Sequence, residues 1–158
     1  MKKYFLVIAI LGLFFACASI QNLTPTQIQA MTTKQFEENY ETTFRSTLSL
    51  VQAEGFIIDD ANKETGIIKA NKRIDHSKKR KEIDATTAKI TFYMEELNPN
   101  LTEVKLTIYE GTIKTSHTGY YVRTKSTDVK ESMLMDAQIY TTWFNNLQKE
   151  IERRKAVR

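Results

Sequence analysis

The chain has a single cysteine, Cys17, and only two histidines, and this scarcity excludes several kinds of chemistry. One cysteine cannot form a disulfide within the chain, so the core must be stabilised by packing alone. His76 and His117 lie in polar stretches without a second histidine or a carboxylate at metal-ligand spacing, which favours ordinary surface positions. No serine stands in a nucleophile elbow. These absences predict a non-enzymatic protein that holds neither a metal nor a cofactor.

The chain also has little excess charge of either sign. Its formal net charge is +4, and two of these charges belong to Lys2 and Lys3 at the start of the chain. Proteins that bind nucleic acid usually carry a larger and clustered basic excess. We therefore expect no nucleic-acid partner.

Long apolar runs are equally scarce, and the one that exists lies at the start of the chain. Residues 4–15 are apolar or small, and this run is shorter than the roughly 20 residues that a transmembrane helix needs. Lys2 and Lys3 precede the run, and the small residue Ala16 follows it. A charged start, a short apolar segment and a small residue form the anatomy of a secretory signal. The sequence therefore predicts export, with residues 1–16 as the signal peptide.

Residues 13–17, Leu-Phe-Phe-Ala-Cys, resemble the lipobox of bacterial lipoproteins, in which the cysteine is acylated and becomes the first residue of the mature protein. The resemblance implies a lipid anchor on Cys17 and no remaining free thiol. Each buried methylene contributes about 0.8 kcal/mol, so two or three acyl chains hold a protein durably on a membrane. Ala18 is not the aspartate that retains such proteins in the inner membrane. The resemblance implies the outer membrane, facing the periplasm, or the outer cell face in a bacterium with one membrane.

The segment after Cys17 shows little periodicity. Residues 18–31 are expected to form a tether with a short helical turn over residues 26–31, and an extended tether of this length reaches roughly 45 Å.

A helix is predicted after the tether. Thr32 and Gln35 have the spacing of a capping box, and apolar residues then recur at helical spacing as far as Val51. Gly55 should end this helix in a left-handed conformation, with Phe56 folding back on Val51.

Two strands of a hairpin are predicted over residues 56–58 and 67–70. Turn-forming residues separate them, and Gly66 should supply a positive φ. Asp60, Asn62 and Glu64 alternate as calcium ligands do, but the glycine comes one position late and no distal glutamate follows, which favours a plain turn. Residues 72–81 are highly charged and predict an exposed loop or a strand extension.

The clearest strands cover residues 87–94 and 103–109, where apolar and polar residues alternate. This period of two predicts an antiparallel sheet that is covered on one side only. The Asn-Pro-Asn sequence at residues 98–100 marks the turn between them. Gly111 is a candidate bulge before a continuing strand, and residues 120–124 predict a further strand or an ordered loop.

A long helix is predicted at the end of the chain. Asp128 can cap it, and apolar residues recur at spacings of three and four from Val129 to Ile151. About 27 helical residues would span about 40 Å. Phe44, Phe92, Tyr140, Trp143 and Phe144 are expected in the core.

These elements predict an α+β fold in which residues 32–158 form a single domain. The expected architecture is a two-layer sandwich, with an antiparallel sheet of three to five strands and two helices packed on one face. The element order is α-β-β-β-β-α.

Several short motifs carry a resemblance to known proteins: Phe36 and Tyr40 before Phe44, Gly55-Phe56-x-Ile58, Lys63-Glu64-Thr65-Gly66-x-Ile68, and the entry segment over residues 23–36. They are similar to small bacterial outer-membrane lipoproteins. More distantly, they resemble the helix-grip domains of the C subunit of the outer-membrane β-barrel assembly machinery. The resemblance covers residues 23–70 and, more loosely, the final helix. It implies a helix-grip-like fold and an envelope location.

Two groups of residues are candidate contact sites. The first is a basic stretch near one hairpin that suits an anionic lipid or polysaccharide, although charge runs are often simply solvated: Lys72, Arg73, Lys78, Lys79, Arg80 and Lys81. The second is the polar face of the main hairpin, with Tyr93, Lys105 and Tyr109. That face can receive another protein, or its tyrosines can serve only to stabilise the sheet.

The sequence thus predicts a membrane-anchored envelope lipoprotein that acts as a binding or scaffolding module. The alternative is a carrier that holds a lipid or another small apolar ligand between the sheet and the helices.

Overall fold

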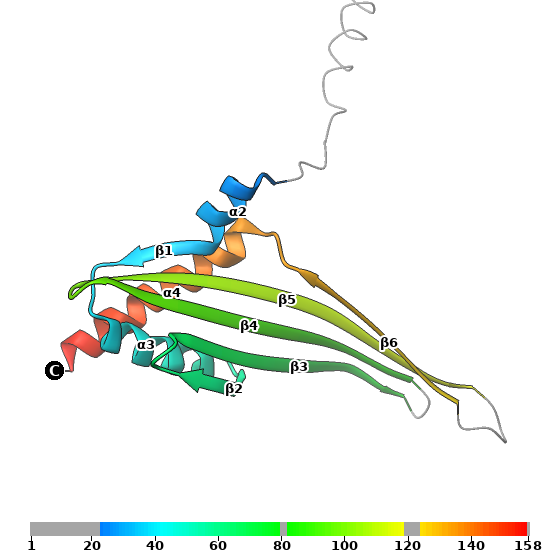
Figure 1. Ribbon diagram of the computed structural model, residues 1–158. Helices are drawn as coiled ribbons and strands as arrows, with labels where there is room; N and C mark the ends of the chain where they lie inside the picture. The colour runs from blue at the N-terminus through cyan, green and yellow to red at the C-terminus, as the bar shows by residue number, and fades with distance from the viewer. Residues whose placement is uncertain (1–22, 80–81, 119–123, 158) are drawn as a thin grey trace, which may run out of the picture.

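The computed structural model describes residues 23–79, 82–118 and 124–157. These residues form three helices and six strands, which together make an α+β fold (Figure 1). Their bounds, in chain order, are α2 Pro25–Thr32, β1 Thr33–Phe36, α3 Tyr40–Ala53, β2 Ile57–Asn62, β3 Ile67–Lys79, β4 Glu82–Asn98, β5 Leu101–Thr118, β6 Thr124–Met133 and α4 Ala137–Ala156. Within these residues, no helix has both the length and the apolar character needed to cross a bilayer.

The six strands form one antiparallel sheet in the order β1-β5-β4-β3-β2, and β6 pairs with a second part of β5. β1 pairs with residues 102–105 of β5, whereas β6 pairs with residues 109–118. The prediction of three to five strands was too low, because the edge strand β1 and most of β6 lie in segments that were expected to be helical. The predicted turn between β4 and β5 is confirmed at Asn98 and Leu101.

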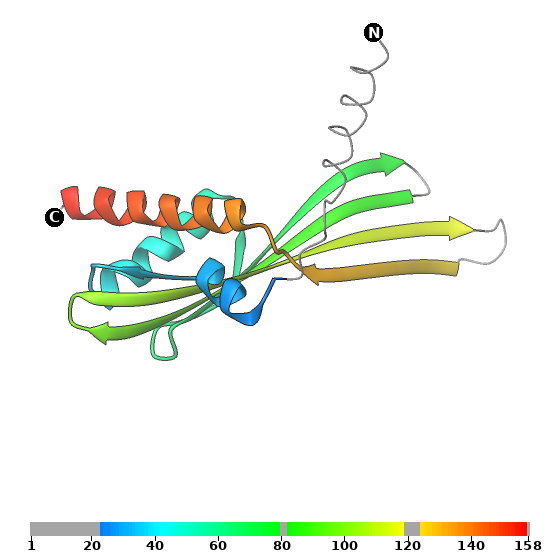
Figure 2. The same ribbon diagram turned by 90° about the horizontal axis from the view of Figure 1, so that it is seen from above.

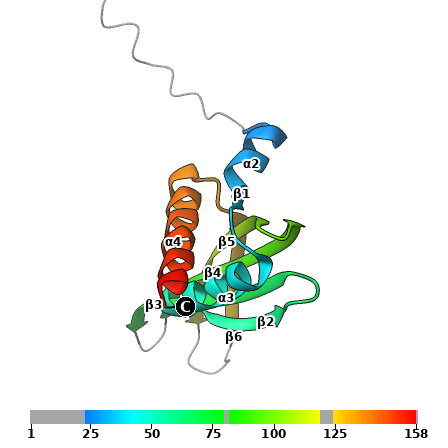
Figure 3. The same cartoon turned by 90° about the vertical axis from the view of Figure 1, so that its left-hand side faces the viewer.

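The helices α3 and α4 lie on the same side of the sheet, on what we call the inner face (Figures 1 and 3). They cover only the half of the sheet near the β4–β5 turn. Figure 2 shows that the β3–β4 and β5–β6 hairpins extend well beyond the helices. Residues 72–79, predicted as a loop or a strand extension, continue β3 into this projecting part.

The core lies between the inner face and the two helices. The alternation predicted for β4 and β5 is confirmed, because every second residue is buried there: Ile90, Phe92, Met94, Val104, Leu106 and Ile108. Phe44, Tyr140 and Phe144 of the helices are buried against them, as predicted. Trp143 is half-buried, with its ring centroid 5.7 Å from that of Phe56 and 5.9 Å from that of Phe92.

The predicted end of the first long helix is confirmed at atomic detail. Gly55 has φ 77°, and its amide donates to the Gln52 carbonyl oxygen at 3.0 Å. The Phe56 amide donates to the Val51 carbonyl oxygen at 3.1 Å. These two bonds form a Schellman motif, which only a residue tolerant of positive φ permits.

The predicted start of that helix was wrong. Residues 33–36 form β1, and Gln35 donates its side-chain amide to Glu103 of β5 at 3.1 Å instead of closing a capping box. The helix α3 begins after Asn39, whose side-chain oxygen accepts from the Thr42 amide at 2.9 Å. Pairing with β5 gives the backbone groups of residues 33–36 the hydrogen bonds that a helix would otherwise have given them.

The segment expected to be a tether is partly helical. The expected turn over residues 26–31 lies inside α2, which starts with a capping box between Thr24 and Gln27. The Thr24 amide donates to Gln27 Oε1 at 2.8 Å, and the Gln27 amide donates to Thr24 Oγ1 at 3.3 Å. Only residues 18–24 therefore remain between Cys17 and the first residue of α2.

The predicted start of the last helix at Asp128 was also wrong. Residues 124–133 form β6, and α4 begins after Asp136, whose Oδ1 accepts from the Gln138 amide at 2.8 Å. The spacing of Val129 and Met133 suits one face of a strand as well as one face of a helix. β5 continues to Thr118, and its free edge pairs with this segment.

Two glycines allow close backbone approaches. Gly66 has φ 71°, as predicted, and a Cβ there would lie 2.1 Å from the Met94 carbonyl oxygen. The predicted bulge at Gly111 is wrong, because the register of β4 and β5 runs without a shift through the Thr87–Gly111 pair. A Cβ at Gly111 would lie 2.8 Å from Thr87 Oγ1 and 2.9 Å from Glu131 Cγ. Glycine is needed there for space between neighbouring strands.

Candidate functional site

The outer face of the sheet, opposite α3 and α4, carries the same five-residue pattern on two neighbouring strands. Both β4 and β5 contain Lys-x-Thr-x-Tyr, at residues 89–93 and 105–109. The antiparallel register places the two copies side by side in opposite directions: Lys89 with Tyr109, Thr91 with Thr107, and Tyr93 with Lys105. The intervening residues are buried on the inner face, so these six side chains belong to the outer face.

The structure thus brings together the three outer-face residues proposed from the sequence. Tyr93 and Tyr109 are each 44% exposed, and Lys105 is exposed as well. The contact candidates proposed from the sequence did not include Lys89, although the predicted alternation places it on the polar side of its strand. The repeated Lys-x-Thr-x-Tyr pattern was the signal that could have identified it.

The helix α2 forms one wall of a groove on this face. The groove encloses about 620 Å³ and is lined by Pro25, Ile28, Gln29, Thr32, Lys105, Thr107, Tyr109 and Met133. A neighbouring hollow of about 240 Å³ is lined by Gln29, Thr33, Tyr93, Glu95, Glu103 and Lys105. Because Gln29 and Lys105 line both spaces, we treat them as one outer groove.

The edge of β5 has a gap between its two partner strands. β1 pairs with β5 as far as Lys105 and β6 from Tyr109 onward, so residues 106–108 lie between the two edge strands. At Ile108, hydrogen bonds with other segments replace the backbone hydrogen bonds that a neighbouring strand would make. The Leu134 amide donates to the Ile108 carbonyl oxygen at 2.8 Å, and the Ile108 amide donates to the Tyr140 hydroxyl at 3.3 Å.

The Tyr140 hydroxyl contacts backbone groups on the β6 side of this gap. It also donates to the Leu134 carbonyl oxygen at 3.0 Å. Burial raises the pKa of this hydroxyl above its ordinary value, because ionisation in a dry site is unfavourable. The residue therefore remains a neutral donor and acceptor at physiological pH, which suits a structural role beside the groove.

The two lysines of the repeated pattern differ in their partners. Lys89 forms an ion pair with Glu131 of β6, with Nζ and Oε1 2.7 Å apart. Lys105 has no ion pair with any side chain that the structure describes, although Glu95 and Glu103 line the groove beside it. The outer groove thus offers one unpaired ammonium group together with hydroxyl, amide and aromatic groups.

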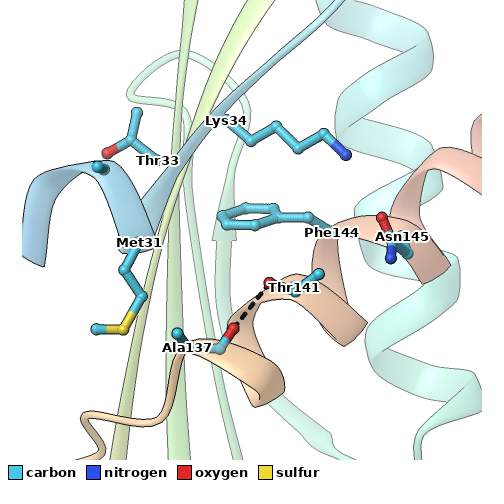
Figure 4. A pocket seen from close by; sticks show the side chains of 8 residues that line it. Met31, Thr33, Lys34, Ala137, Thr141, Phe144 and Asn145 are labelled. Carbon is cyan, nitrogen blue, oxygen red and sulfur yellow. Dashed lines mark hydrogen bonds between the residues drawn. The ribbon is translucent and has the colours of Figure 1, made fainter. Parts of the chain in front are cut away.

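A second hollow lies between α2, β1 and α4, and Figure 4 shows it from close by. It encloses about 250 Å³ and is lined by Ala30, Met31, Thr33, Lys34, Ala137, Thr141, Phe144 and Asn145. In Figure 4 the Phe144 ring lies between Lys34 and Thr141. The hydroxyl of Thr141 is already committed, because it donates to the Ala137 carbonyl oxygen at 2.8 Å.

The basic stretch is not assembled into one site in the described residues. Lys72 Nζ donates to the Glu54 carbonyl oxygen at 2.7 Å and lies 5.5 Å from the Phe56 ring centroid, so this lysine stabilises the end of α3. Arg73 is exposed on β3. Lys78 and Lys79 end β3, and their side chains lie outside the described part, as do Arg80 and Lys81 entirely.

The remaining candidates have the following positions. Cys17 and most of residues 120–124 lie outside the described residues, and His76 and His117 belong to β3 and β5, with side chains outside the described part. Asp60 and Asn62 belong to β2, and Glu64 follows in the turn. In the described residues, no group of three or more histidine, cysteine, aspartate or glutamate side chains is placed to hold a metal ion.

Comparison of the chain with family models, curated proteins and solved structures finds no match in any of the three.

Proposed function

We propose that this protein is a membrane-anchored envelope lipoprotein that acts as a binding or scaffolding module without catalytic activity. The observation that carries the proposal is the lipobox-like sequence that ends at Cys17, a few residues before a folded domain. In this proposal, acyl chains on Cys17 concentrate the domain at a membrane surface, most simply the periplasmic side of an outer membrane. The likeness to helix-grip domains belongs to the same proposal, supported by helices that precede and follow the antiparallel strands.

Two surfaces are suited to the binding role. One is the outer groove, which combines exposed tyrosines with an unpaired lysine. The other is the pair of hairpins that project beyond the helices, one of which contains the basic stretch (Figure 2). A partner for the basic stretch would be an anionic lipid, an acidic polysaccharide or an acidic protein surface.

Replacing Cys17 by serine tests the anchor. Wild-type protein should appear in the membrane fraction, with a mass that includes acyl chains on the cysteine. Cys17→Ser should remain unprocessed or leave the membrane fraction. The control is Ser19→Ala, which keeps the cysteine and should be processed normally. Identical processing and membrane retention of the Cys17→Ser variant would refute the proposal.

Crosslinking in intact cells tests the binding role. A photoreactive amino acid at Lys69, on the outer face, and one at Lys149, on α4, provide a matched pair of exposed lysine positions. The proposal expects discrete crosslinked species with protein or lipid at Lys69, and few at Lys149. Equal and diffuse crosslinking at all positions would contradict it.

The carrier function remains the second candidate, and the hollow beside α2 is the observation that favours it. Between the inner face and the helices, Ile68, Phe92 and Leu106 are fully buried. The hollow lined by Met31 and Phe144 encloses about 250 Å³, and an apolar cavity of about 150 Å³ already binds benzene. In this candidate function, a small apolar ligand would lie between α2 and α4, against Met31 and Phe144.

Native mass spectrometry after gentle purification tests the carrier function. A retained small molecule should be lost from Thr141→Leu, which fills the hollow, and kept by Thr142→Leu, whose side chain does not line it. Absence of any retained molecule, or its retention in both variants, would count against the carrier.

A further inference from the structure

The helix α2 is exposed to solvent yet carries no charge. Residues 18–33 contain no aspartate, glutamate, lysine or arginine, and most of α2 is exposed, including Pro25 and Gln29. The other end of the fold differs, because α4 has a highly charged exposed surface: Lys149, Glu152, Arg153 and Lys155. A solvated helix is usually charged on its open side, so α2 is unusual in this respect.

The distance from the proposed anchor to α2 is short. Only residues 18–24 separate Cys17 from Pro25, and a fully extended chain of this length spans at most about 28 Å. Pro25 lines the outer groove. Whatever conformation the intervening residues adopt, acyl chains on Cys17 would keep the groove within that distance of the lipid.

The residues beside α2 are of the kinds found at the level of lipid headgroups. Tyr93 and Tyr109 expose amphipathic rings, which favour the boundary between hydrocarbon and water. Lys105 lies between them on β5, and Lys69 is placed opposite Thr91 on the same face. Lysine side chains can extend their ammonium groups toward lipid phosphates while their methylenes remain on apolar surface.

Most acidic residues of this face lie toward one end or are already paired, and Asp60 lies opposite Lys69 at the β2 edge. Glu95 and Glu103 oppose each other near the β4–β5 turn, and Glu103 accepts a hydrogen bond from Gln35 at 3.1 Å. Glu131 is neutralised by Lys89. The part of β4 and β5 between Tyr93 and Tyr109 therefore contains two lysines and no acidic residue on its outer face.

We infer that α2 and the outer face between Tyr93 and Tyr109 rest against the phospholipid headgroups of the membrane that holds Cys17. The inference rests on the proposed acylation and adds an orientation to it. In this orientation α3 and α4 face away from the lipid, and the projecting hairpins remain available to another partner.

Site-specific fluorescence on vesicles tests this orientation. The experiment uses the full acylated protein in vesicles of phosphatidylethanolamine and phosphatidylglycerol, with a nitroxide quencher on some headgroups. Because Cys17 is the only cysteine and would be acylated, one introduced cysteine gives one label. The matched pairs are Thr107→Cys against Thr142→Cys, and Gln29→Cys against Gln138→Cys, with the second member of each on α4.

The expected result is quenching that is several-fold stronger for labels at Thr107 and Gln29 than for labels at Thr142 and Gln138. Equal quenching within both pairs, with the protein floating with the vesicles, would overturn the orientation and leave the anchor intact. Protein that does not float with the vesicles, and takes up a second label on Cys17, would refute the anchor and the orientation together.

Discussion

The Tyr140 hydroxyl on α4 accepts a hydrogen bond from the Ile108 amide on β5 and closes a gap in the edge of the sheet. The same hydroxyl donates to the Leu134 carbonyl oxygen, so one side chain satisfies two backbone groups from different segments. Tyr140 is only 1% exposed, which prevents water from replacing it. One phenol of α4 therefore ties β5 to the segment that follows β6.

Tyr140→Phe tests this junction. The substitution keeps the ring in the core but deprives the Ile108 amide and the Leu134 carbonyl of their partner, which should cost about 1–3 kcal/mol of the free energy of unfolding. Denaturant-induced unfolding measures the change. Tyr109→Phe, at an exposed position with the same chemistry removed, should change the value by less than about 0.5 kcal/mol. Equal effects of the two variants would contradict the structural role of Tyr140.

The two glycines with positive φ should differ in their tolerance of alanine. Gly55→Ala places its Cβ 3.5 Å from the end of the Lys72 side chain, so the cost should be the conformational penalty of about 1–2 kcal/mol. Gly66→Ala has a similar φ but would bring Cβ within 2.1 Å of the Met94 carbonyl oxygen, and the hairpin must shift. Thermal unfolding should show a clearly larger loss for Gly66→Ala. A loss no larger than that of Gly55→Ala would be inconsistent with the close approach.

Two buried hydroxyls on α3 are predicted to be destabilising. Thr42 Oγ1 and Ser46 Oγ are inaccessible and have no hydrogen-bond partner in the part of the chain that the structure describes. Thr42→Val or Ser46→Ala should therefore raise the free energy of unfolding, by about 1 kcal/mol, because an unpaired buried hydroxyl is costly. Thr47→Val is the control, since the Thr47 hydroxyl donates to the Thr43 carbonyl oxygen at 2.9 Å. Thr47→Val should destabilise the protein, and a stabilisation of the same size as for Thr42→Val would argue against this reasoning.

An ion pair on α4 should contribute to the pH dependence of stability. Arg153 donates to both Glu150 carboxylate oxygens, at 2.7 and 2.6 Å, and holds the pKa of Glu150 below its ordinary value. A lowered carboxyl pKa stabilises the fold above the pKa of the unfolded chain, and this stabilisation is lost as the pH falls through the folded pKa. The pair is partly exposed, so its contribution should not exceed about 1 kcal/mol.

Glu150→Gln measures that contribution. Its free energy of unfolding should be below that of the wild type at neutral pH, and the two values should converge as the pH falls below the ordinary carboxyl range. In an Arg153→Gln background the same substitution should have a smaller effect at neutral pH. A difference that is independent of pH would show that the pair is not the cause.

The sequence allowed the α+β class, the two main strands and the glycine-dependent turns to be predicted, because each has a local cause. The Schellman end at Gly55 and the turn at Gly66 depend on a φ that few other residues adopt. The alternation in β4 and β5 reflects one buried face, which periodicity reveals directly.

The errors occurred where tertiary pairing outweighed a local pattern. Thr-x-x-Gln occurs at residues 24–27 and 32–35, and only the first forms a capping box, because the second pairs with β5. Val129 and Met133 suit a helix as well as a strand, and the free edge of β5 decides between them. The outer groove was not predictable as a groove, because its wall comes from α2, a segment expected to be mainly a tether.

The pairing of β1 with β5 has a consequence for the order of folding. Thr33 must find Lys105, whose strand follows α3 and three further strands, whereas β2 to β5 each pair with the next strand along the chain. Contacts between distant parts of a chain form late, because the entropy cost of closing a long loop comes before these contacts can stabilise the fold. We expect the first strand to dock last, so that the segment nearest the N-terminus completes a sheet already assembled from residues that follow it.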